Sequence, residues 1–254
     1  MINIPKNVKF LIVGVCSYLF FNTAQAQEQL KLYYESPAEK WTEALPIGNG
    51  SLGAMIYGDV SQEHIQFNEE TLWAGKPHDY AHKGAYKYLG EIRQLLTDGK
   101  QREAQDLGNK EFMSVPLKQI HYQPFGDVYI DFSGHEKYSE YARELDLNNA
   151  VSKVSYKVND VIYKREVLSS YPDQVITINL TASESKALNF SIWLDAIHEE
   201  KQVTTSANSQ TLEVHVKDGV LRGVSTIKVK TDGKIESKNG KLSIANASRA
   251  TIYL

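Results

Sequence analysis

The sequence predicts a mainly β protein, an antiparallel β-sandwich with one short helical insertion. Beyond Gly126, apolar and polar residues alternate in successive runs, the pattern of strands that each cover a core on one face. Turn-forming pairs such as Asn159-Asp160 and Asn239-Gly240 separate these runs at hairpin intervals. Only residues 85–112 show helical spacing instead. Together these observations favour two packed sheets.

The first 26 residues have the pattern of an export signal. Lys6 and Lys9 form a positive region, residues 10–21 are mostly apolar, and Ala24-Gln25-Ala26 is a small-x-small cleavage site. The apolar run is shorter than the roughly 20 residues of a membrane span. We therefore predict a signal peptide over residues 1–26, no membrane anchor, and a bacterial protein exported to the periplasm or the exterior.

The early strands are expected before residue 70. Residues 30–34, 52–57 and 64–67 are predicted strands, with an exposed turn at residues 46–50 and a second turn at Gly58-Asp59. One helix follows from the spacing of Ala85, Leu89, Ile92 and Leu96 and ends at Gly99, and a second is expected over residues 100–112. Residues 121–125 are a predicted loop, broken by Pro124.

The later strands fill the rest of the chain. The alternating runs cover residues 154–158, 176–180, 188–194 and 212–216. Residues 250–254 also have the composition of a strand, and the sequence stops within it. Since chain ends are usually polar and frayed, we expect residues 27–254 to be a β-sandwich domain that is incomplete at its C-terminal end.

Composition excludes some partners. The formal charge is −3 without a stripe of Lys or Arg, so nucleic acid is not an expected partner. Cys16 is the only cysteine and lies in the predicted signal, so the mature domain has to be stable without disulfides. No cofactor motif is present. The 15 tyrosines outnumber Phe and Trp together, which favours strands and wet, sugar-like surfaces.

The candidate binding residues come at the end of the predicted strand at residues 64–67 and in the loop at residues 121–125. They are Asn68, Glu69 and Trp73, and Tyr122 and Gln123. A flat aromatic ring can pack on the C–H face of a sugar while amide and acid groups bind its hydroxyls. The alternative is structural, with Trp73 in the core and both Glu69 and Glu70 on the solvated surface. The spacing of these residues alone does not decide between sugar binding and a structural role.

Four motifs in chain order make the pattern more specific. They are GNGSLGAM with NEETLW at residues 48–55 and 68–73, YQPFGDV at 122–128, YARELDL at 141–147, and YKREV with SYPDQ at 163–167 and 170–174. Over residues 32–195 the chain thereby resembles glycoside hydrolase family 95, the α-L-fucosidase and α-L-galactosidase family. Ala142 and Leu168 depart from that pattern on strand surfaces, outside the motif loops.

The resemblance implies an N-terminal β-sandwich of the super-sandwich type that precedes an (α/α)6 barrel. In that family the barrel carries the catalytic acid and base, so no catalytic residue is expected in this sequence. An inverting site needs two carboxyl groups about 6.5–9.5 Å apart. Glu69 and Glu70 are adjacent on a strand and would point to opposite faces, so we reject them as that pair.

The implied function is that of the N-terminal domain of an exported inverting exo-glycosidase, an α-L-fucosidase that acts on terminal α-L-fucosyl or α-L-galactosyl residues. Its partners would be a fucosylated glycan and its own catalytic barrel, and this chain alone would be inactive. A different class remains open, namely a carbohydrate-binding or structural β-sandwich without catalysis.

The remaining polar groups favour structural roles. His78 and His82 have the i, i+4 spacing of helical metal ligands, but Pro77 and Gly84 argue against a helix, and we predict no metal site. Arg143-Glu144 and Arg165-Glu166 are expected to form charge pairs between strands on the surface.

Overall fold

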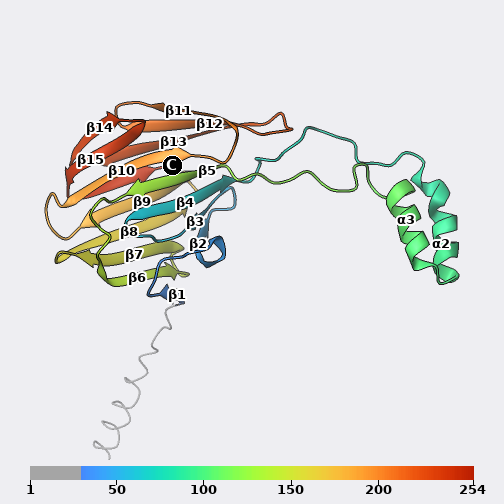
Figure 1. Cartoon of the computed structure of the whole chain (residues 1–254), viewed down its shortest axis with the longest axis horizontal. Coiled ribbons are helices and arrows are strands. Elements are labelled where there is room, and N and C mark those ends of the chain that lie inside the picture. The colour runs from blue at the N-terminus through green and yellow to red at the C-terminus, as the bar shows by residue number, and fades with distance from the viewer. Residues whose placement is uncertain (1–29) are drawn as a thin grey trace, which may run out of the picture.

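The computed structural model describes residues 30–254 (Figure 1). The predicted signal peptide, residues 1–26, lies outside the described residues. Within residues 30–254, no helix has the length and apolar character to cross a bilayer.

Two antiparallel sheets form the body of the domain, which confirms the predicted β-sandwich. One sheet has nine strands, in the order β1 (Lys31–Tyr34), β6 (Ser139–Asp146), β7 (Val151–Val158), β8 (Val161–Ser170), β9 (Val175–Ala182), β16 (Arg249–Tyr253), β13 (Arg222–Thr231), β12 (Ser209–His215) and β11 (Glu200–Thr205). The other has seven, in the order β14 (Lys234–Lys238), β15 (Lys241–Ala247), β10 (Leu188–Asp195), β5 (Gly126–Asp131), β4 (Gln62–Glu69), β3 (Leu52–Ile56) and β2 (Leu45–Gly48). A short 3-10 helix, η1 (Trp41–Glu43), precedes β2.

The core lies between the sheets and is built from alternate residues of each strand. In β9, Ile176, Ile178 and Leu180 are at most 1% exposed, and in β12 Leu212 and Val214 are fully buried. The period-2 pattern in the sequence therefore identified the inward face of these strands correctly. Burial of such apolar area, at about 25 cal/mol per Å², is the main stabilising contribution to the fold.

Turn chemistry fixes the hairpin register. Asn159 and Asp160 have φ of 48° and 68°, and Asn239 and Gly240 have φ of 50° and 71°. Two consecutive positive φ values are typical of type I′ turns, in which Asn, Asp and Gly are favoured. Both predicted hairpins are confirmed.

The expected turn at residues 46–50 is wrong in part, because Leu45–Gly48 form β2. Leu45 and Ile47 point into the core, at 2% and 8% exposure, so this short segment alternates like any other strand. Pro46 obscured the pattern. β2 is an edge strand, where a residue without a backbone N–H is tolerated.

The helical insertion is confirmed and forms an arm, residues 76–119, that projects from one end of the sandwich (Figure 1). It consists of η2 (Ala85–Tyr88), α2 (Leu89–Thr97) and α3 (Gln101–Glu111). Gly99 joins the two α-helices with φ of 76°, as expected of a C-terminal cap. α2 has no buried residue and α3 has only Ala104, so the arm shares little core with the sheets.

The predicted surface pairing of Arg143 and Arg165 is wrong. Both side chains point inward and are 3% and 2% exposed. Arg165 Nη2 lies 3.0 Å from Oε2 of the fully buried Glu63, which links β8 of one sheet to β4 of the other. Arg143 donates to the backbone oxygens of Ser36 and Glu43, each at 2.7 Å, and so anchors the chain before β2.

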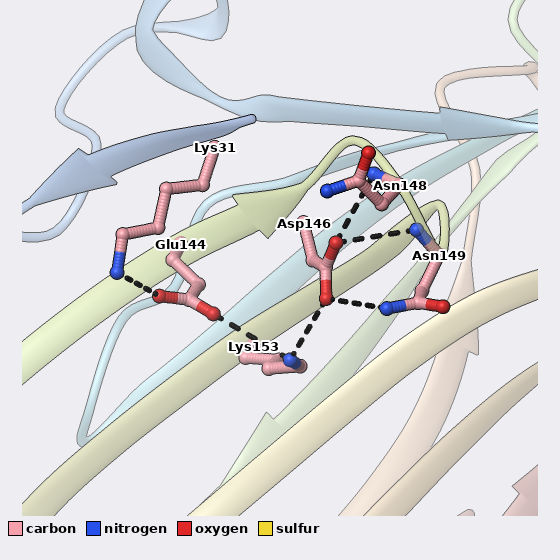
Figure 2. Close-up of polar contacts among 6 residues, drawn as sticks. All are labelled: Lys31, Glu144, Asp146, Asn148, Asn149 and Lys153. Atoms are coloured by element: carbon pink, nitrogen blue, oxygen red, sulfur yellow. Dashed lines mark hydrogen bonds and ion pairs between the residues drawn. The ribbon is translucent and has the colours of Figure 1, made fainter. Parts of the chain in front are cut away.

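Glu144 does pair across strands, but with lysines (Figure 2). It accepts from Lys31 of β1 at 3.3 Å and from Lys153 of β7 at 3.5 Å. Lys153 also reaches Asp146 at 3.3 Å. These side chains lie on the outer face of the nine-stranded sheet and help to hold the edge strand β1 in place.

Candidate functional site

The predicted binding residues gather at one end of the sandwich. This end, here called the rim, is formed by residues 48–52, 68–73, 122–126, 170–175 and 215–222. Backbone hydrogen bonds tie its segments together, including Glu70 to Ser51, Gln123 to Leu72, and Gly75 to Asp218. The arm leaves the sandwich from the same end (Figure 1).

Trp73 and Tyr122 form an aromatic pair on the rim. Their backbones make an isolated antiparallel bridge, and their ring centroids lie 5.1 Å apart at an interplanar angle of 57°. The Trp73 indole N–H donates to the Glu70 carbonyl oxygen at 2.9 Å, and the Tyr122 hydroxyl donates to the Glu69 carbonyl oxygen at 3.0 Å. The residues remain 39% and 41% exposed, so the anchored pair still offers area to a ligand or to another protein surface.

The Glu69 carboxylate closes the turn after β4. Its Oε2 accepts hydrogen bonds from the backbone N–H and the hydroxyl of Thr71, at 2.9 and 2.6 Å. Burial raises the pKa of the neighbouring Tyr122 hydroxyl, and the negative charges of Glu69 and Glu70 raise it further. The Tyr122 phenol is therefore neutral and able to donate near pH 7.

Asn68 and Gln123 are held in different ways. Asn68 Oδ1 accepts from the Phe125 backbone N–H at 2.6 Å, and this bond fixes the start of β5 against the end of β4. The Gln123 side-chain amide donates within its own loop, to the carbonyl oxygens of His121 at 3.3 Å and Tyr122 at 3.4 Å. Asn68 also lines a hollow, whereas Gln123 does not.

The Gly-rich turn at residues 48–50 joins the two sheets. Asn49 Oδ1 accepts from the backbone N–H groups of Ser51 and Leu52, at 3.0 and 2.7 Å, while its amide donates to the Ser170 carbonyl oxygen at 2.8 Å. Gly50 adopts φ of 97°, which only glycine reaches without strain. The Gly-Asn-Gly sequence at residues 48–50 is thus explained by turn formation.

The hollow beside Asn68, here called the slot, has a volume of about 220 Å³ and lies between β9 and β13. It is lined by Leu52, Phe67, Asn68, Glu69, Phe125, Gln174, Ile176, Val224, Ser225, Thr226 and Leu254. Sequence reasoning did not single out Gln174 or Ser225, because Gln174 is only the last residue of the SYPDQ motif and Ser225 lies in no motif. Only the sheet order brings them next to Asn68.

A second hollow of about 380 Å³ borders the β12–β13 turn. Glu199, Glu200 and Asp218 line it, and Lys217 forms an ion pair with Glu199 at 3.0 Å. In the described part of the chain, no group of three His, Cys, Asp or Glu side chains is placed to hold a metal ion. His78 and His82 instead contact the backbone oxygens of Val115 and Met113, at 2.6 and 3.2 Å.

Glu63 is a buried carboxyl group whose pKa is raised. Burial raises this pKa, and the nearby Arg165 guanidinium opposes the shift. A raised carboxyl pKa is typical of a general acid, but Glu63 is 0% exposed and lines none of the hollows described above. It holds the two sheets together and is out of reach of a substrate.

Comparison with known proteins gives consistent matches. The model of a family described as glycosyl hydrolase family 65, N-terminal domain, matches residues 32–254. Alpha-L-fucosidase 2 of Arabidopsis thaliana is 35% identical over 253 residues, covering 89% of this chain and 30% of that protein. Probable alpha-fucosidase A of Aspergillus oryzae is 28% identical over 242 residues, covering 87% of this chain and 32% of that protein. The chain therefore spans about a third of the length of these relatives.

Proposed function

Because the chain belongs to the family of glycosyl hydrolase family 65 N-terminal domains, we propose that it is the N-terminal β-sandwich domain of an α-L-fucosidase of the family 95 type. The enzyme would be exported and would hydrolyse terminal α-L-fucosyl or α-L-galactosyl residues of glycans with inversion. One observation carries the proposal, namely 35% identity to an alpha-L-fucosidase across 89% of the chain. The four motifs that resemble those of family 95 also support an α-L-fucosidase of the family 95 type among the proteins that share this N-terminal domain.

The proposal assigns the chemistry to an (α/α)6 barrel and not to this chain. The burial of Glu63 supports this division, because this carboxyl group, whose pKa is raised, is sealed in the core. Of the two acidic residues in the NEETLW motif, Glu69 is engaged by Thr71. On its own, the chain would be catalytically silent.

The rim would face the barrel and would contribute to it in two ways. Trp73 would brace the contact between the domains, because a large indole gains most from burial and its exposed area is already held in place by Tyr122. Asn68 and Gln123 would border the sugar pocket, since amides can bind hydroxyl groups as donor and acceptor. Tyr122 would position Trp73 through the contact between their rings, and Glu69 would fix the turn after β4 through Thr71.

A domain exchange tests the proposal. Residues 27–254 would replace the matching region of Arabidopsis alpha-L-fucosidase 2, and hydrolysis of an aryl α-L-fucoside would be measured. We expect a folded chimera that retains activity, and no activity in a control enzyme that lacks the domain altogether. A chimera that folds but is inactive would contradict the assignment. Tight binding of fucosylated glycans by the isolated chain, with an inactive chimera, would favour the non-catalytic binding module.

A further inference from the structure

The dipeptide Asn-Gly occurs twice in the chain, at residues 49–50 and 239–240, in two different settings. Asparagine is chemically labile before glycine, because the backbone nitrogen of the next residue can attack the side-chain amide and glycine has no Cβ to hinder the attack. The reaction needs a side chain that is free to rotate onto that nitrogen. The local structure therefore decides which of the two asparagines reacts.

Asn239 is free to react. It lies with Gly240 in the exposed turn between β14 and β15, and a Cβ added at Gly240 would meet no atom within 4 Å. In the described part of the chain, neither the Asn239 side chain nor the Gly240 N–H has a hydrogen-bond partner within the protein. The two-residue turn accounts for this freedom, since the strand pairing on either side belongs to Lys238 and Lys241.

Asn49 also precedes a glycine but is locked on the rim. Its Oδ1 accepts from the backbone N–H groups of Ser51 and Leu52, and its amide donates to the Ser170 carbonyl oxygen. All three hydrogen bonds have to break before the Asn49 side chain can turn toward the Gly50 nitrogen. Since each bond adds to the free energy of local opening, the reactive conformation of Asn49 is rarely populated.

We propose that Asn239 is a site of spontaneous deamidation and isomerisation in the folded protein and that Asn49 is protected. The Gly240 nitrogen loses its proton and bonds to Asn239 Cγ, and the Cγ–Nδ2 bond breaks. Ammonia leaves with that proton, and a five-membered succinimide ring remains. Water then adds to one of the two ring carbonyl carbons, whose bond to the ring nitrogen breaks. Opening at Cγ gives aspartate, and opening at the backbone carbonyl carbon gives isoaspartate, with the main chain running through Cγ.

The two products affect the hairpin differently. Aspartate adds only a negative charge between Lys238 and Lys241, and Asp-Gly suits the same type I′ turn. Isoaspartate adds a carbon atom to the main chain, so the turn no longer supports the pairing of these two lysines. It also displaces the Gly240 carbonyl oxygen, which accepts from Nε2 of the fully buried Gln210 at 2.6 Å. Because a buried N–H that loses its acceptor is costly, isoaspartate should lower the Tm.

The test ages the full chain in warm, mildly alkaline buffer, either folded or unfolded in urea, and maps the products by mass spectrometry. Cleavage after glutamate releases residues 44–63 and 237–254, each with one Asn-Gly pair. In the folded chain we expect Asn239 to convert at least about tenfold faster than Asn49. In urea the two should convert at similar rates, because both precede glycine. The Tm of the folded sample should fall as isoaspartate accumulates, whereas the Tm of Asn239→Gly, which keeps a favourable turn, should stay constant.

Two outcomes would overturn the proposal. One is an Asn239 that stays intact in the folded chain but converts in urea, which would mean that the turn protects it. The other is conversion of Asn49 as fast as that of Asn239 in the folded chain. An unchanged Tm in a sample with mostly isoaspartate at position 239 would refute the effect on the hairpin. None of these measurements uses enzymatic activity, so this inference and the proposed glycosidase function fail separately.

Discussion

Single residues show most clearly where sequence reasoning succeeds and where it fails. The five rim residues were found because their chemistry is concentrated in two short motifs, and the fold does bring them together. Arg165 was misplaced because a charged residue in an alternating strand is normally solvated. Its burial depends on Glu63, which lies 102 positions earlier on the other sheet, and no local pattern reveals such a partner.

The Glu63–Arg165 pair should be costly to break. Arg165→Ala leaves the Glu63 carboxylate buried without its cation, and we expect a loss of about 3–5 kcal/mol in the free energy of unfolding. The double variant Glu63→Leu/Arg165→Met, with no buried charge, should recover much of that loss. Urea denaturation of the three proteins would measure both effects. A single variant as stable as the parent would show that the pair does not hold the sheets.

Asp146 should give the fold a measurable pH dependence. Hydrogen bonds from Asn149 are the main cause that lowers its pKa to about 2, with a further contribution from Lys153. Since the folded pKa lies below the ordinary value of 3.8, the stabilisation is complete above pH 4 and is lost as pH falls toward 2. The urea midpoint of the parent should therefore fall more steeply over this range than that of Asp146→Asn. Asp218→Asn, at an exposed turn position, is the control and should keep the parental slope.

Trp73 separates the two roles proposed for the rim. In the chimera that carries residues 27–254, Trp73→Ala should lower the Tm with little change in kcat per folded molecule, as expected of a brace. Loss of Asn68 or Gln123 should instead reduce kcat/KM while the Tm is kept, by up to a few kcal/mol in transition-state binding. A Trp73→Ala enzyme that melts normally but is inactive would reverse the first assignment. Unchanged kinetics in both amide variants would remove the second.

At the scale of elements, strong periodicity in the sequence was sufficient to predict a strand or a helix. The alternating runs predicted at residues 154–158, 176–180, 188–194 and 212–216 mark β7, β9, β10 and β12, and the two helices of the arm follow from the 3.6-residue spacing of apolar residues. β2 was missed because four residues with a proline are too few to show alternation. The order of the strands within each sheet could not be predicted from periodicity. β16 lies between β9 and β13, and only long-range packing decides that position.

The arm should be dispensable for folding of the sandwich. Replacing residues 76–119 by a short Gly-Ser linker removes helices with almost no buried residues, so the Tm of the β domain should change by only a few degrees. The helical contribution to the far-ultraviolet circular dichroism should disappear. Removal of residues 234–247, which include the buried Leu242 and Ile244, is the comparison and should unfold the domain. A large loss of stability on removing the arm would mean that it packs on the sheets.

At the scale of the whole molecule, the fold and the functional assignment rest on different observations. The sandwich positions its motif residues on a rim and keeps Glu63, whose pKa is raised by burial, sealed inside. Fold alone does not define an activity, so the assignment to a fucosidase depends on the motifs and the named relatives. The slot could not have been foreseen, because its lining comes from both sheets.

The central claim is that this chain serves a glycosidase without performing the chemistry itself. The most direct measurement is to incubate purified residues 27–254 with aryl α-L-fucosides and fucosylated oligosaccharides and to follow product release. The account predicts turnover no greater than in a blank without protein. Turnover well above that blank, abolished by Glu69→Gln or Glu70→Gln, would contradict it and place the catalytic groups on the rim.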